Sequence, residues 1–287
     1  MSAIDLAAEL PIAATALTEP SERGTNLFVR LVKGLFSAAV SVGVVLGAWW
    51  LFLEYFQVKP FLGKGPSDVW HYLFITDTAG EHRHVIFGES MTTIRDAFLG
   101  LSAGTAAAIL AAVAFNIWRA VERTFMPIAM VLRSVPLVAM TPLIVLIFGR
   151  DLVAVTVIAG IVTFFPTLVN VTLALRATPR ESLDLLRAYG ASPAKTLWKV
   201  QVPSALPALF ASLRIAAPLA LVGALLSEWL ATGEGLGYAI LQAGALSEYN
   251  GLWARVSLIT LYSILLYKAI GAVERAVLAR YAPTFSR

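Results

Sequence analysis

Residue types that usually carry chemistry are present, but their spacing does not form a catalytic site. The stretch EHRHVIF places His82 and His84 beside Glu81, and two histidines separated by one residue could bind a metal ion from an extended strand. No third ligand stands near them, so we interpret the pair as part of a solvated loop. The chain also lacks an H-E-x-x-H motif, a carboxylate pair and a nucleophile with a base at motif spacing. The sequence therefore predicts neither an enzyme nor a metal centre.

Glycine-rich nucleotide motifs are also missing. No G-x-x-x-x-G-K-S/T loop occurs that could hold ATP phosphates. The stretch GEGLG at 233–237 has glycines at alternate positions, without the G-x-G-x-x-G spacing of a dinucleotide site. We interpret it as a flexible outer turn near a gate, and we expect no cofactor bound by this chain. The absence of cysteine excludes disulfides and thiolate metal sites.

The hydrophobic composition indicates that the surrounding elements cross a membrane. Of 287 residues, 58% are hydrophobic and 14% are charged, whereas soluble domains average about 45–50% apolar and about 25% charged residues. A spanning helix needs about 20 mainly apolar residues. Six segments qualify, at approximately 34–56, 94–116, 125–148, 152–175, 204–231 and 253–273. We therefore predict an all-α integral membrane protein with about six transmembrane helices and no large soluble domain.

The positions of Lys and Arg predict the orientation of these helices. If the N-terminus is cytoplasmic, only Lys59, Lys64, Arg83 and Arg150 among the loop residues fall outside. Because Lys and Arg flanking short loops are retained in the cytoplasm, we expect both termini inside. We predict a cytoplasmic tail at 1–30, without the basic start of a secretory signal, a membrane domain at 31–281 and a C-terminal tail at 282–287. The basic residues form no single patch, so we expect no nucleic acid partner.

One predicted cytoplasmic loop, at about 177–203, has the signals of two capped helices. Thr178, Pro179 and Glu181 match an N-cap, a proline at the first helical position and a capping-box acid. Gly190 suits a left-handed helix stop. Leu183, Leu186 and Tyr189 are expected on one face of the first helix, and Glu181, Asp184 and Arg187 on another.

The second helix of this loop begins with the same kind of signal. Ser192 and Pro193 repeat the cap and the proline, and we expect the helix to end at Pro203. A passive connection does not need two helix starts and a glycine turn, and a DNA-reading helix-turn-helix would be tethered at both ends to the bilayer. We therefore interpret the loop as a protruding helical segment that binds a cytoplasmic partner.

The order of motifs resembles a known family. Asp184 with Leu185 and Leu186, then Gly190, then V-Q-V-P ending at Pro203, is similar to the cytoplasmic signature of bacterial ABC importer permeases, with two leucines in place of the usual small pair. The stretches GKGPSDVWHYL, PIAMVLRSVPLVAMTPLIVLIFG, FFPTLVNV, LPALFASLRIA and GEGLGYAI follow the order found in permeases of the nitrate, sulfonate, taurine and bicarbonate group. The resemblance covers roughly residues 60–245.

This resemblance implies a type I ABC importer permease of the bacterial inner membrane. Two permease copies, expected as a homodimer with a heterodimer as the alternative, would form the pore. Two ATPase subunits would bind ATP and Mg, and an extracytoplasmic solute-binding protein would deliver the substrate. The residues implied to couple to the ATPase are Asp184, Leu185, Leu186, Arg187, Tyr189, Gly190, Ala191, Ser192, Pro193 and Pro203.

Two questions of function stay open at the level of sequence. The substrate is expected to be a small anion, with an uncharged or aromatic vitamin precursor as the alternative. A stand-alone carrier or channel is a second class of function, but the chain shows no inverted repeats with paired broken helices, as a carrier of the usual kind would. The ATP-driven pore subunit is therefore the preferred interpretation.

Prolines and charges inside the spans indicate a translocation path. The third to fifth spans contain prolines, among them Pro136, and a proline frees carbonyls that neighbours or a water-lined cavity must satisfy. Arg133, Arg214 and Glu228 are ionisable residues in the same spans, where charges usually face a bundle interior. The alternative is that the arginines reach lipid phosphates or pair with acids between subunits. The first two spans have small residues at four-residue spacing, Gly43 and Gly47, then Gly100, Gly104, Ala108 and Ala112, which favours close helix packing.

Overall fold

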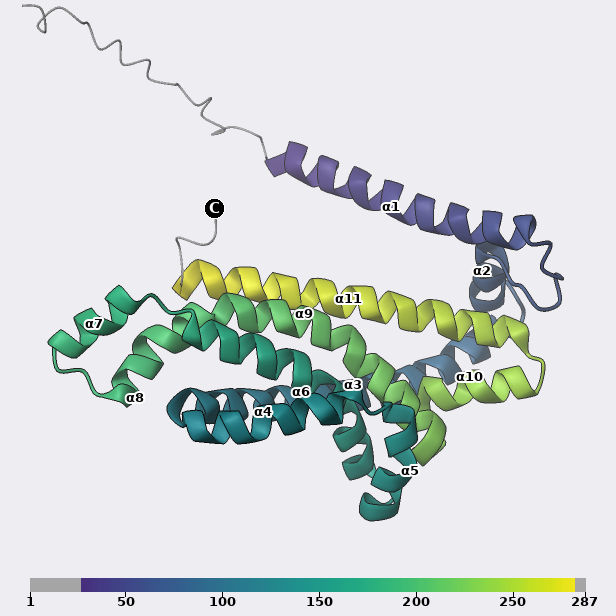
Figure 1. The fold of residues 1–287 in the computed structure, drawn as a ribbon. Helices are drawn as coiled ribbons and strands as arrows, with labels where there is room; N and C mark the ends of the chain where they lie inside the picture. Colours follow the sequence, from purple (N-terminus) through teal and green to yellow (C-terminus); the bar gives the residue numbers. More distant parts are fainter. Residues whose placement is uncertain (1–26, 282–287) are drawn as a thin grey trace, which may run out of the picture. The chain divides into compact units, whose positions relative to one another are not determined.

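The computed structural model describes residues 27–281, which divide into two units (Figure 1). The first unit contains one helix, α1 (Leu27–Tyr55), and the second begins at Val58. The predicted tails lie outside the described residues, except that α1 already begins at Leu27, inside the range 1–30. Every regular element between 27 and 281 is helical, so the predicted all-α class is confirmed.

The second unit contains all remaining helices. In chain order they are α2 (Pro66–Phe74), α3 (Ala79–Ile117), α4 (Arg119–Ser134), α5 (Leu137–Phe148), α6 (Leu152–Arg176), α7 (Arg180–Ala188), α8 (Pro193–Thr196), the π-helical turn η1 (Leu197–Gln201), α9 (Val202–Ser227), the π-helical turn η2 (Glu228–Thr232), α10 (Gly235–Ala245) and α11 (Tyr249–Tyr281). Within the described residues, five helices are long and apolar enough to cross a membrane, and a sixth span is present if α4 and α5 count as one. This agrees with the prediction of about six spans.

Helix α3 packs against α6 through small residues, as the four-residue spacing predicted. A Cβ atom on Gly100 would overlap Ala159, and one on Gly104 would overlap Thr163. The hydroxyl of Thr163 donates to the carbonyl oxygen of Gly100 over 3.2 Å. Ala108 and Ala112 continue the same buried stripe. Because lipid offers no hydrophobic drive for helix association, such close backbone contact is a main source of helix–helix stability.

The third predicted span is not one straight helix. Helices α4 and α5 meet at an angle of 106°. Val135 lies between them in an extended conformation, with φ −75° and ψ 126°, and Pro136 occupies the cap position of α5. A proline disfavours helical dihedrals for the residue before it, which explains why the helix ends there. Pro142, in contrast, lies within α5 without ending it.

Two helices extend beyond the apolar segments predicted from sequence. α3 begins at Ala79 rather than at 94, and α11 covers Tyr249–Tyr281 rather than 253–273. A hydropathy window detects only the part of a helix that lies in hydrocarbon, whereas the hydrogen-bonded backbone continues into water. In α3 the extension is held by Arg83, whose guanidinium donates to the carbonyl oxygen of Leu73 in α2 over 2.6 Å.

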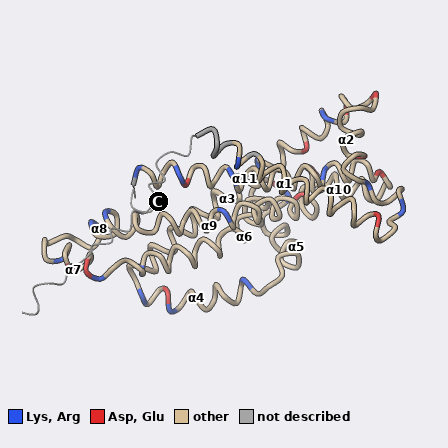
Figure 2. Tube along the Cα trace, turned by 90° about the horizontal axis from the view of Figure 1, so that it is seen from above, with Lys and Arg blue, Asp and Glu red and all other residues tan. Residues whose placement is uncertain are grey.

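The second unit has two ends of different character. Helices α7 and α8 lie at one end, together with the start of α4, and α2 and α10 lie at the other (Figures 1 and 2). The first end contains the predicted partner-binding loop. The second contains the GEGLG turn and the histidine pair.

Candidate functional site

The turn between α7 and α8 has the glycine geometry that the sequence predicted. Gly190 has φ +70°, a value that favours glycine. Its N–H donates to the carbonyl oxygen of Arg187 over 2.9 Å, and the N–H of Ala191 donates to that of Leu186 over 2.9 Å. These two bonds form a Schellman motif, which satisfies the last carbonyls of α7. The predicted left-handed stop at Gly190 is confirmed.

The two predicted helix starts have different outcomes. Ser192 caps α8, because its side-chain oxygen accepts from the N–H of Lys195 over 3.3 Å. The predicted N-cap at Thr178 is wrong: α7 begins at Arg180, with Pro179 in the cap position. The Thr178 hydroxyl instead donates to the carbonyl oxygen of Leu175 over 3.1 Å. It therefore satisfies the end of α6, not the start of α7.

The second helix of the loop does not end at Pro203, contrary to the prediction. It continues through η1 into α9, and Pro203 lies within the first two positions of α9. At this junction the N–H of Val202 donates to the carbonyl oxygen of Leu197, a π-helical bond. Proline lacks an N–H and crowds the carbonyl four residues before it, and we attribute the wider turn to this crowding. The loop is thereby joined to a membrane helix without a break.

A hydrogen-bonded pair holds the base of this loop. The side-chain amide of Asn116, at the end of α3, donates to the side-chain oxygen of Gln201 in η1 over 3.0 Å. The Gln201 amide donates in turn to the carbonyl oxygen of Leu175 in α6 over 3.3 Å. Three helices therefore meet at Gln201, a residue that the sequence analysis did not single out.

The tip of the loop exposes polar and apolar side chains together. Leu185 is 59% exposed and Tyr189 is 82% exposed, so Tyr189 does not share the half-buried face of Leu183 and Leu186, contrary to the prediction. Asp184 and Arg187 form an exposed ion pair of 3.2 Å. Exposed apolar groups with a polar rim are typical of a protein-binding surface.

The structure places the predicted path residues in three separate surroundings. Arg133 and Pro136 lie together at the break between α4 and α5, and both are exposed. Arg214 forms an ion pair with Glu274 of α11, and its guanidinium lies 5.8 Å from the ring centre of Tyr267. Arg214 thus has an acidic partner within its own chain, rather than between subunits.

Glu228 is completely buried at the other end of the unit, with 0% exposure. Its Oε2 accepts from the N–H of Gly237 over 2.7 Å. A Cβ atom on Gly235 or Gly237 would meet the carboxylate, so these glycines allow the approach. The N–H of Leu236 donates to the Thr93 hydroxyl over 2.9 Å. The prediction of an outer turn at GEGLG is therefore wrong for residues 235–237, which are buried and begin α10, whereas Gly233 and Glu234 are exposed between η2 and α10.

A second buried acid near this turn was missed. Asp96 in α3 is 1% exposed and forms an ion pair with Arg95, whose Nε donates to its Oδ1 over 3.0 Å. The signal was available, because Asp96 is an ionisable residue inside a predicted span. Its span, 94–116, contains no proline, so the proline criterion did not select it.

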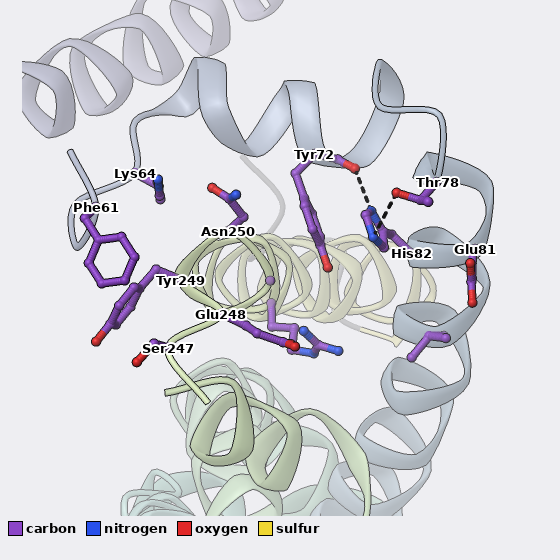
Figure 3. Close-up of a pocket in the computed structure, with 13 residues that line it drawn as sticks. Phe61, Lys64, Tyr72, Thr78, Glu81, His82, Ser247, Glu248, Tyr249 and Asn250 are labelled. Atoms are coloured by element: carbon purple, nitrogen blue, oxygen red, sulfur yellow. Dashed lines mark hydrogen bonds between the residues drawn. The ribbon is translucent and has the colours of Figure 1, made fainter. Parts of the chain in front are cut away.

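At the same end, a cavity of about 590 Å³ opens between α2, α3 and the start of α11 (Figure 3). His82 lies in its wall, on helix α3 rather than in a loop, so that part of the prediction is wrong. Its ring stacks on Tyr72 with 4.0 Å between centroids, and its Nδ1 donates to the Tyr72 carbonyl oxygen over 3.2 Å. Two residues apart on a helix, His82 and His84 point in different directions, and no metal-binding cluster is present among residues 27–281.

One residue that lines this cavity, Arg255, forms a bidentate ion pair. Arg255 of α11 donates to both carboxylate oxygens of Glu89 in α3, over 2.7 and 2.8 Å. Burial raises the pKa of the neighbouring Tyr72 phenol above its usual value, although Arg255 opposes the shift. The phenol therefore stays protonated at neutral pH and can donate a hydrogen bond. Polar contacts around the cavity thus connect α2 to α3 and α3 to α11.

Comparison with known proteins places this arrangement in a family. The family described as "Binding-protein-dependent transport system inner membrane component" matches residues 104–282. A probable ABC transporter permease protein of Haemophilus influenzae is 31% identical over 84% of this chain and 95% of its own length. The formylaminopyrimidine transport permease protein ThiX of Halalkalibacterium halodurans is 31% identical over 77% of this chain and 86% of its own length.

A third relative and a solved structure extend the comparison. The taurine transport system permease protein TauC of Escherichia coli K12 is 24% identical over 82% of this chain and 86% of its own length. The fold is similar to a chain of the MetNI methionine ABC transporter in an inward-facing conformation, with a TM-score of 0.57 and 22% identity over 71% of this chain and 99% of that chain. The resemblance inferred from the sequence motifs is therefore confirmed, and so is the type I importer fold.

Proposed function

The chain belongs to the family of binding-protein-dependent transport system inner membrane components, and from this premise we propose a specific transport role for it. As a permease subunit of an ABC importer, it is a multi-pass inner-membrane protein and not an enzyme, because ATP hydrolysis belongs to a separate subunit. Its partners are an ATPase and a solute-binding protein. The residues that meet the ATPase, the orientation, the assembly and the substrate are the content of the proposal.

The α7–α8 loop is the proposed ATPase contact. The observation that carries this assignment is the Schellman turn at Gly190, which holds two short helices at a defined angle. The exposed Leu185 and Tyr189 supply apolar contact area, and Asp184 and Arg187 supply charge. Since α8 continues through η1 into α9, a displacement of the loop is transmitted directly to a membrane helix.

Orientation and assembly follow from the same loop. With α7 and α8 in the cytoplasm, both termini are cytoplasmic and the α2–α10 end faces outward, as the Lys and Arg distribution favours. Each chain carries one such loop, and two ATPases need two. We therefore propose a homodimer of this permease with two ATPase copies, to be checked by the mass of the intact complex.

A small anion is the proposed substrate class. Arg133 lies exposed at the α4–α5 break, and no described carboxylate pairs with it. An unpaired arginine inside a spanning segment favours an anionic solute in the path. An aromatic, uncharged solute is the second candidate, because the relative ThiX is named for formylaminopyrimidine transport and is more similar to this chain than TauC is.

The test is substrate-stimulated ATP hydrolysis in the assembled complex. The permease, its ATPase and its binding protein are reconstituted, and sulfonates, taurine, nitrate and bicarbonate are compared with aminopyrimidines and riboflavin. Stimulation by one of the anions supports the primary proposal, and stimulation by the heterocycles alone selects the second candidate. Uptake by the permease in liposomes without any ATPase would contradict the ATP-driven function.

A further inference from the structure

A groove beside the proposed ATPase contact has the chemistry of a lipid-binding site. It lies between α4 and the segment from the end of α6 to η1, with a volume of about 1580 Å³. Figure 2 shows basic segments at α7, α8 and the start of α4, at the same end of the unit. Five arginines line the groove, Arg119, Arg123, Arg176, Arg180 and Arg187, against two acids, Glu122 and Asp184.

The two acids do not neutralise all of these arginines. Arg176 pairs with Glu122, and Arg187 pairs with Asp184. Arg119, Arg123 and Arg180 form no ion pair with any described residue. Three positive charges therefore converge on one groove without a carboxylate partner, which favours an anionic ligand.

The side chains that line the groove change from charged to apolar along α4. At about 100° per residue, Arg119, Arg123, Met126 and Met130 fall within roughly 60° around the helix axis, and all four line the groove. The arginines lie in the first turns of α4 and the methionines lie deeper along it. A ligand that follows this face therefore meets charge first and then flexible apolar side chains, which adapt to irregular partners.

The opposite side of α4 faces outward with apolar side chains. Phe125 is 54% exposed and Ile128 is 50% exposed, and in a bilayer such a side contacts acyl chains or another membrane helix. If acyl chains cover this side, only helix α4 separates the hydrocarbon from the groove. A free phosphate ion would use the arginines alone, whereas a phospholipid would use both the arginines and the methionines.

We propose that this groove binds an anionic phospholipid of the cytoplasmic leaflet, with its phosphate between Arg119, Arg123 and Arg180 and an acyl chain along Met126 and Met130. Basic pockets between helices on the cytoplasmic side bind such headgroups through charge and close fit. The inference rests on the proposed function, which places the α7–α8 end of the protein in the cytoplasm. Because Arg180 begins α7, the bound lipid connects α4 to the ATPase-binding loop and stabilises the position of that loop.

The lipid site is tested with the full-length permease, with and without its ATPase. Native mass spectrometry counts the phosphatidylglycerol retained after purification from mixed phosphatidylcholine and phosphatidylglycerol nanodiscs. The variant Arg119→Gln/Arg123→Gln is compared with Arg275→Gln/Arg280→Gln, which removes the same charge at the end of α11, outside the groove. With about a fivefold effect for each arginine near the surface, the groove variant should bind phosphatidylglycerol about 25-fold more weakly, and the α11 variant should bind it normally.

Further measurements distinguish a bound lipid headgroup from a soluble phosphate compound and from ATPase docking. Inorganic phosphate and glycerol 3-phosphate at millimolar concentration should not displace the lipid, and displacement by either would show a soluble-anion site and overturn the proposal. Equal retention of phosphatidylglycerol by both variants would also overturn it. If the groove variant lost its ATPase in pure phosphatidylcholine, the arginines would be docking residues instead. Because lipid retention by the permease alone needs no ATPase, its outcome is independent of whether the proposed function holds.

Discussion

The side-chain amide of Asn116 donates a hydrogen bond to the Gln201 side chain across 3.0 Å, joining residues 85 positions apart in the chain. Gln201 also donates to the Leu175 carbonyl oxygen. The end of α3, the end of α6 and the π-helical turn η1 are therefore connected by one side chain. We therefore expect a displacement of the α7–α8 loop to reach α3 and α6 through this residue.

Breaking this connection should uncouple ATP hydrolysis from transport. Gln201→Ala leaves the Asn116 amide without its partner, which costs about 1–3 kcal/mol where the group is shielded from water. The Leu175 carbonyl loses one of its two donors and keeps the Thr178 hydroxyl. We expect substrate-stimulated hydrolysis to fall while basal hydrolysis remains. A double-mutant cycle with Asn116→Ala should give a coupling energy of about 1 kcal/mol in thermal unfolding. Strict additivity of the two substitutions would contradict the link.

The turn at Gly190 should tolerate only residues that adopt positive φ. No atom lies within 4 Å of a Cβ built there, so the cost of a substitution comes from the backbone alone. Gly190→Val should cost about 1–3 kcal/mol locally and reduce ATPase co-purification. Gly190→Asn is the matched control, because asparagine visits this conformation more readily. Both should reach the membrane normally, and equal ATPase binding by both would contradict the role of the turn.

Reversing the charge at Asp184 should weaken docking without unfolding the loop. The side chain is exposed, so Asp184→Lys should change stability by less than about 0.5 kcal/mol. We expect its affinity for the ATPase to fall at least about tenfold, because the reversed charge opposes the complementary charge of the partner surface. The swap Asp184→Arg/Arg187→Asp retains the local ion pair but reverses the surface pattern. Restored affinity in the swap would show that only the internal pair matters.

The α3–α6 contact predicts opposite effects for two glycines of one helix. Gly100→Ala places a Cβ against Ala159 and should destabilise the protein by about 1–3 kcal/mol. Gly88 lies in the same helix with open space around its Cα, so Gly88→Ala should be neutral or stabilise by up to about 1 kcal/mol. Thermal unfolding in detergent and membrane abundance measure both. Equal effects would contradict the packing of α3 on α6.

Arg133 and Arg214 should differ in their roles, the first in substrate uptake and the second in protein stability. Arg133 is exposed at the α4–α5 break, so Arg133→Ala should lower uptake of an anionic substrate while abundance stays normal. Arg214→Ala leaves Glu274 without its partner in a shielded position and should lower abundance first. Immunoblots of membranes, run beside uptake assays, separate the two effects. Full uptake by Arg133→Ala would remove it from the path.

The features determined by sequence alone are those that depend on neighbours in the chain. Residues 152–175 were predicted as a span and form α6 over Leu152–Arg176, because a run of apolar residues must form a hydrogen-bonded helix in hydrocarbon. The Gly190 stop and the Ser192 cap were also predictable, since each depends on local dihedral angles and bonds over three to five residues. The spacing of Gly100 and Gly104 indicated a packing face, although not which helix it contacts.

Tertiary structure decided which distant groups meet. Thr178 has the sequence context of a helix cap, yet its hydroxyl satisfies α6, because a hydroxyl bonds to whichever shielded group lies nearest. Glu228 was visible as a charge in a span, but its contact with the N-terminus of α10 depends on how α9 and α10 turn around η2. His82 could be placed on Tyr72 only after α2 and α3 were packed. Such contacts arise from the arrangement of whole helices, and periodicity along the chain carries no information about the side chains that a neighbouring helix will bring.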